Sequence, residues 1–141
     1  MRPTLPLALL LAACSGQSEQ KPAQRQAGTG TFAGEGRDRY CIKRSGDDWR
    51  VGIVTYGPGN MNCTLKGKVV EALNHDSLVE ATGDKACRFQ VTAEGDSLRL
   101  PQKLPAACDY YCGPGASLSG KTFKLDPSAS PTVDFAGDPL C

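Results

Sequence analysis

The stretch ACRFQVTAEGDSLRL, residues 86–100, alternates apolar and polar side chains on both sides of a short turn sequence. From Cys87 to Ala93 every second residue is apolar, and the residues between them are Arg, Gln and Thr. This period of two is typical of a half-buried antiparallel strand. The letters EGDS then supply a tight turn, after which LRL resumes the alternation. The stretch therefore predicts a β-hairpin from Cys87 to Leu100.

The same alternation extends toward the N-terminus. In RYCIKR, residues 39–44, Tyr40 and Ile42 share one face, and in DWRVGIVTY, residues 48–56, one face carries Trp49, Val51, Ile53 and Thr55. Turn sequences separate the alternating segments at RSGDD (44–48), YGPGN (56–60), LNHDS (73–77) and ATGDK (81–85). Turns at this spacing predict a mainly β fold, a small antiparallel β-barrel or sandwich meander of roughly seven or eight strands.

The first residues have the order of a secretory signal. A charge at Arg2 precedes an apolar stretch from Leu5 to Leu11 and two small alanines. That stretch is much shorter than the roughly 20 residues that span a bilayer, so we expect export and not a membrane span. The four residues Leu11-Ala12-Ala13-Cys14 resemble the lipobox of bacterial lipoproteins. The resemblance implies cleavage before Cys14 and acylation of this cysteine; the alternative is an ordinary cleaved signal.

A polar tether is expected between the acylated cysteine and the folded domain. Residues 15–30, SGQSEQKPAQRQAGTG, contain no aromatic or branched aliphatic side chain and cannot bury enough surface to offset the entropy of ordering. We therefore predict a signal peptide at 1–13, a lipid anchor and flexible tether at 14–30, and a single disulfide-rich β domain at 31–141. Ser15 after the cysteine resembles lipoproteins passed to the outer membrane, which implies a site on that membrane facing the periplasm.

Six further cysteines lie in the predicted β domain: Cys41, Cys63, Cys87, Cys108, Cys112 and Cys141. An even number in an exported chain predicts three disulfides, for which 15 pairings are possible. The segment LPAACDYYC, residues 104–112, is expected to form one short helix with Pro105 in its first turn. If Cys108 and Cys112 share a helical turn, each should reach a different strand.

The inventory of reactive side chains predicts neither a metal site nor a catalytic centre. Zinc sites combine close cysteine pairs such as C-x2-C with histidine, whereas the closest pair here is Cys108 and Cys112 and the one histidine, His75, lies in a turn sequence. Hydrolysis by serine or cysteine also needs a base, usually histidine. Glu71 and Glu80 are expected on the outward faces of strands. We predict no catalytic residue, no metal and no cofactor, and a hydrolase that uses two carboxylates stays open as an alternative.

Adjacent tyrosines at 110 and 111 suggest a binding surface. Tyr110 and Tyr111 cannot both point inward from one segment, so one ring should be exposed, between two cysteines that would hold it rigidly. A rigid exposed tyrosine offers a large contact area at a low entropy cost. The alternative is that one ring caps the end of the barrel.

The charges of the chain are balanced. The sequence has 16 Lys and Arg and 15 Asp and Glu, and Arg2 is the only charged residue before Cys14, which leaves 15 of each sign from Cys14 onward. Binding to nucleic acid requires a basic excess on one face, so we expect no nucleic-acid partner.

Three functions are compatible with the sequence. The first is a membrane-anchored, non-enzymatic domain that binds an envelope or host protein, including as an inhibitor of an enzyme. Its acylated tether, disulfides and small β domain are similar in architecture to small periplasmic lipoproteins that inhibit lysozymes or proteases, although no inhibitor motif is present. The second is a structural or assembly accessory of the outer membrane. The third is the carboxylate-dependent hydrolase.

Overall fold

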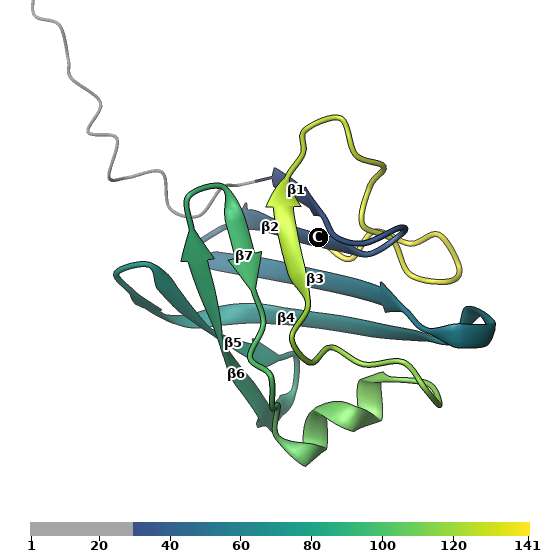
Figure 1. The fold of residues 1–141 in the computed structure, drawn as a ribbon. Coiled ribbons are helices and arrows are strands. Elements are labelled where there is room, and N and C mark those ends of the chain that lie inside the picture. Colours follow the sequence, from purple (N-terminus) through teal and green to yellow (C-terminus); the bar gives the residue numbers. More distant parts are fainter. Residues whose placement is uncertain (1–29) are drawn as a thin grey trace, which may run out of the picture.

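The computed structural model describes residues 30–141, which form a closed antiparallel barrel of eight strands in meander order (Figure 1). Each strand pairs with its neighbours along the chain, and β1 pairs with β8 to close the barrel. The strands are β1 (Gly30–Ala33), β2 (Arg39–Ser45), β3 (Asp48–Tyr56), β4 (Asn62–Leu73), β5 (Asp76–Ala81), β6 (Asp84–Glu94), β7 (Ser97–Arg99) and β8 (Thr122–Leu125). The predicted fold class is confirmed, and of the two predicted architectures the chain adopts the barrel.

The predicted hairpin is present as β6 and β7. Ala93 pairs with Leu98, and Glu94 pairs with Ser97 across a turn in which Gly95 adopts a φ of 58°. The apolar residues of β6 point into the barrel, where Cys87, Phe89 and Val91 are all less than 5 % exposed. The period-two pattern therefore identified the inward face of this strand correctly.

The barrel interior is filled from all sides by the alternating residues of the strands. Tyr40 is fully buried; its ring packs edge-on against Phe32 with centroids 6.0 Å apart and in a tilted arrangement against Phe123 with centroids 5.6 Å apart. On β3 the inward residues Val51 and Ile53 have no exposed surface. The interior is thus a packed core, and burial of these rings supplies much of the hydrophobic stabilisation.

The last sixteen residues cover part of the outside of the barrel. After β8, residues 126–141 cross toward β2 and β3, where Cys141 forms a disulfide with Cys41 (Figure 1). Leu140 packs on Val54 and Cys41 in a second, smaller apolar cluster. Because of this cover, both faces of β3 are buried over residues 51–55, although alternation alone predicts one buried face.

A short 3-10 helix, η3 (Ala106–Tyr111), lies at one end of the barrel, and a shorter 3-10 turn, η2 (Pro58–Asn60), connects β3 to β4. The expected short helix is therefore present as a 3-10 helix, and Pro105 stands immediately before its first residue as the N-cap. Among residues 30–141 no helix is long and apolar enough to cross a bilayer.

Three disulfides join the six cysteines of the barrel region: Cys41 to Cys141, Cys63 to Cys112 and Cys87 to Cys108. The predicted framework of three bridges is confirmed. Cys108 reaches β6 and Cys112 reaches β4, as expected for two cysteines on one helical turn that bond to different strands. The signal peptide, Cys14 and the tether up to residue 29 lie outside the described residues.

Candidate binding surface

The tyrosine pair lies on η3, which is attached to the barrel at both ends. Cys108 near the start of the turn is bonded to Cys87 of β6, and Cys112 just after its end is bonded to Cys63 of β4. The backbone N–H of Gly113 also donates a hydrogen bond of 2.8 Å to the carbonyl of Asn62. A turn of six residues that is cross-linked to two strands of the barrel, β4 and β6, has little freedom to move relative to them.

Tyr111 is the inward member of the pair. Its ring packs against the barrel core, and its hydroxyl donates a hydrogen bond of 3.0 Å to the carboxylate of Asp84 at the start of β6. Partial burial, followed by this hydrogen bond and the negative charge of Asp84, raises the pKa of Tyr111. Tyr111 therefore fixes the orientation of the turn.

Tyr110 is the outward member, with 86 % of its surface exposed. Its ring stands edge-on to that of Tyr111, with centroids 5.4 Å apart. The prediction that only one of the two rings would be exposed is confirmed. The alternative, that one ring packs at the end of the barrel, also holds: Tyr111 packs against the core there, whereas Tyr110 is exposed to solvent.

The surface next to this turn is built from two glycine-rich loops. A Cβ added to Gly57, before η2, would meet the carbonyl oxygen of Gly115 at 2.7 Å, so the two GPG sequences of the chain pack backbone against backbone. Met61, which is 42 % exposed, lies beside Gly113, where an added Cβ would be 3.2 Å from its sulfur. The tyrosine turn thus borders a second exposed apolar side chain.

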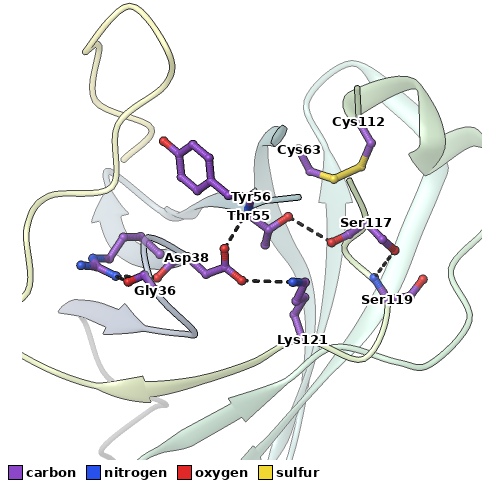
Figure 2. A network of polar contacts seen from close by, with 10 residues as sticks. Gly36, Asp38, Thr55, Tyr56, Cys63, Cys112, Ser117, Ser119 and Lys121 are labelled. Carbon is purple, nitrogen blue, oxygen red and sulfur yellow. Dashed lines mark hydrogen bonds and ion pairs between the residues drawn. A yellow bond between two sulfur atoms is a disulfide. The ribbon is translucent and has the colours of Figure 1, made fainter. Parts of the chain in front are cut away.

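A buried polar network supports this end of the barrel (Figure 2). Asp38, in the loop between β1 and β2, is 3 % exposed; its carboxylate accepts a hydrogen bond from the N–H of Tyr56 at 2.8 Å and lies 3.2 Å from the ammonium of Lys121. Thr55, which pairs with Cys63, donates a hydrogen bond of 3.1 Å to the carbonyl of Ser117. The network therefore ties residues 117–121, downstream of the tyrosine turn, to the end of β3.

A second exposed aromatic residue, Phe135, was missed by the sequence analysis. It is 86 % exposed in the segment that follows β8. Two hydrogen bonds between Asp134 and Asp138, both 2.9 Å long, close the loop that carries it. The Asp134 carboxylate accepts one from the N–H of Asp138, and the N–H of Asp134 donates the other to the carbonyl of Asp138. The turn letters DFAGDP are a local signal of such a loop.

The residues considered for catalysis are scattered over the barrel. His75 is exposed in the turn between β4 and β5, and Glu71 is exposed on β4. Glu80 faces outward on β5 but is only 6 % exposed, because Arg88 on β6 forms an ion pair with its carboxylate. Within residues 30–141 no three His, Cys, Asp or Glu side chains gather as a metal ion would require.

No protein-family model, curated protein or solved structure matches this chain at a significant level.

Proposed function

We propose that this chain is a membrane-anchored bacterial lipoprotein whose barrel binds an envelope or host protein without acting as an enzyme. The observation that carries the proposal is Tyr110, which is 86 % exposed on a turn held by two disulfides and by the anchored ring of Tyr111. A large aromatic side chain exposed on a rigid turn costs little entropy to immobilise in a complex, and tyrosine is enriched among the residues that dominate binding energy.

The anchoring half of the proposal rests on Leu11-Ala12-Ala13-Cys14 and on the polar stretch after it. Two or more acyl chains at one cysteine hold a protein stably on a membrane, because each buried methylene contributes about 0.8 kcal/mol. A coil of about 16 residues has a root-mean-square length of roughly 20–25 Å, which lets the barrel and its tyrosine turn reach a partner above the headgroups. Ser15 after the cysteine, which resembles lipoproteins passed to the outer membrane, supports an anchor on that membrane facing the periplasm.

Affinity capture from cross-linked envelopes tests the binding function. The full chain, a Tyr110→Ala variant and a Lys103→Ala variant are compared by quantitative mass spectrometry; Lys103 is an exposed residue just before η3 and serves as the control. We expect the partner to be retained by the wild-type chain and the control. Its recovery should fall by about 30-fold with Tyr110→Ala, the effect of losing a hot-spot side chain of about 2 kcal/mol.

The identity of the retained protein separates the functions. An enzyme whose activity is titrated to zero at one equivalent of the lipoprotein would establish inhibition. Outer-membrane assembly components or porins would establish the accessory function instead. Equal recovery of every protein by the wild-type chain and by Tyr110→Ala would refute a role for the tyrosine turn.

The anchor is tested separately by Cys14→Ser. Without the thiol no diacylglycerol can be attached, so we expect an unprocessed precursor that takes up no radiolabelled fatty acid. A Cys141→Ser variant, which alters another cysteine, should still be labelled. Normal lipid incorporation in Cys14→Ser would contradict the proposed anchor.

A further inference from the structure

The strand register brings together positive charges that are far apart in the sequence. Lys43 of β2 pairs directly with Arg50 of β3, and Arg50 pairs with Lys68 of β4. The row continues through Glu80 of β5 to Arg88 of β6. All five lie on outward positions, so four cations and one carboxylate form a single line around the outside of the barrel.

Among the described residues, three of these cations form no ion pair with a carboxylate. The Glu80 carboxylate accepts two hydrogen bonds from the Arg88 guanidinium, so those two charges cancel. No described carboxylate lies within 4 Å of the side-chain nitrogens of Lys43, Arg50 or Lys68. Directly paired residues of antiparallel strands have Cβ atoms about 4.5–5.5 Å apart, and like charges at that separation destabilise a sheet.

A hollow lies beside this row, at Lys68 and Glu80. It has a volume of about 570 Å³ and is lined by Lys68 from β4, Glu80 from β5, and Thr82, Gly83 and Lys85 from the turn into β6. Because Arg88 neutralises Glu80, the two lysines give the lining a positive charge. The size is within the range of small-molecule sites, which is about 300–1,000 Å³.

We propose that this hollow is an anion site that binds a phosphate group, with Lys68 and Lys85 as the cationic ligands and the Thr82 hydroxyl as a neutral donor. Arg50 and Lys43 extend the positive field along the row and attract the anion toward the hollow. The phosphate belongs either to a lipid headgroup or to a soluble phosphate compound. The site is independent of the binding function proposed for Tyr110.

The kind of cation in the hollow favours phosphate over carboxylate. A carboxylate is matched best by the planar fork of an arginine, whereas the cations that line the hollow are both lysines. The guanidinium of Arg88, next to Glu80, is already occupied by the Glu80 carboxylate. Lysine ammonium groups are compact charges whose donors can each meet a different oxygen of a tetrahedral phosphate. Two lysines and one threonine line the hollow and supply donors of this kind.

Two probes test the site on the full chain carrying Cys14→Ser, so that no acyl chain contributes to binding. Inorganic phosphate is titrated while backbone amide resonances are followed by NMR at constant ionic strength. Vesicles of phosphatidylcholine, with and without phosphatidylglycerol, are used in sedimentation. The test variant is Lys68→Gln/Lys85→Gln. The matched control is Lys103→Gln/Lys124→Gln, which removes the same charge from exposed positions outside the hollow.

We expect saturable shifts of residues 82–85 with inorganic phosphate, and an affinity at least tenfold lower in Lys68→Gln/Lys85→Gln than in the control. If phosphate binds in this way and vesicle binding is equal in both variants, the ligand is a soluble phosphate. If phosphatidylglycerol increases vesicle binding and only Lys68→Gln/Lys85→Gln loses the increase, the ligand is a lipid headgroup. Equal behaviour of the two variants toward both probes would overturn the proposal.

Discussion

At the scale of single residues, Gly52 decides whether the C-terminal segment can lie on the barrel. An added Cβ would overlap the Cβ of Leu140 and would stand 2.8 Å from the sulfur of Cys41. Its φ is not in the left-handed region, so the requirement for glycine comes from space and not from backbone conformation. Alternation along β3 cannot reveal this requirement, because the crowding residue is 88 positions away in the sequence.

Gly52→Ala should therefore detach the C-terminal segment or strain the Cys41–Cys141 bridge. Overpacking of this kind costs about 1–3 kcal/mol, which is measurable by urea unfolding. Limited proteolysis should show faster cleavage between residues 126 and 140 than in the wild-type chain. Lys103→Ala is an exposed control that should change neither measurement. Wild-type stability and cleavage in Gly52→Ala would contradict the close contact.

Tyr40 makes the free energy of unfolding depend on pH. Complete burial raises the pKa of Tyr40 well above that of an exposed tyrosine, which is about 10, so the folded barrel keeps this phenol protonated. The stabilisation is present below pH 10 and is lost as pH rises above that value, because the unfolded chain then releases a proton that the folded chain retains. From pH 10 upward, Tyr40 should lower the free energy of unfolding by about 1.4 kcal/mol per pH unit.

Tyr40→Phe removes the ionisable hydroxyl and with it this dependence of stability on pH. We expect the free energy of unfolding of Tyr40→Phe, relative to wild type, to rise between pH 9 and pH 11 in brief urea titrations. The hydroxyl of Tyr110, which is on an exposed ring, provides the control in Tyr110→Phe. A difference between Tyr40→Phe and wild type that stays constant over this range would show that the phenol ionises without unfolding.

At the scale of elements, the strands were predictable and their cross-links were not. The hairpin of β6 and β7 and the inward faces of β2 and β3 follow from local alternation, which depends only on the pleat. The burial of Glu80 and the three disulfide pairings depend on which strands become neighbours. Residues up to 100 positions apart are bonded in this way, and a local pattern carries no information about them.

The disulfides should stabilise the barrel in the order of the chain lengths they close. Their sequence separations are 100 for Cys41–Cys141, 49 for Cys63–Cys112 and 21 for Cys87–Cys108. Loop-closure entropy then makes the Cys41–Cys141 bridge contribute about 1.4 kcal/mol more to stability than the Cys87–Cys108 bridge. Paired Cys→Ala variants compared by urea unfolding measure this order. The largest loss on removal of Cys87–Cys108 would contradict an entropic origin and indicate that the bridge supports the tyrosine turn enthalpically.

At the scale of the whole molecule, the barrel distributes its charges and exposed aromatic side chains unevenly. The chain is nearly neutral, yet the register collects Lys43, Arg50 and Lys68 on one line, whereas residues 126–141 contain three aspartates and no lysine or arginine. The net charge of the chain could not predict that these cations and these aspartates gather in different parts of the molecule. The sequence predicted that one ring of the pair Tyr110 and Tyr111 would be exposed, because both tyrosines and the two cysteines are local, but it did not show which one. The exposed ring of Phe135 was missed, although the turn sequence around it indicates a loop.

Contact between the rigid turn at Tyr110 and a partner protein can be detected by site-specific photo-cross-linking in the cell envelope. A photoreactive phenylalanine analogue is placed at position 110 or, as a control, at the exposed position 103. We expect one dominant cross-linked adduct from position 110, whose yield saturates as the amount of lipoprotein is increased. No adduct of the same mass should form from position 103. Absence of an adduct at position 110, or identical adducts at both positions, would contradict the claim.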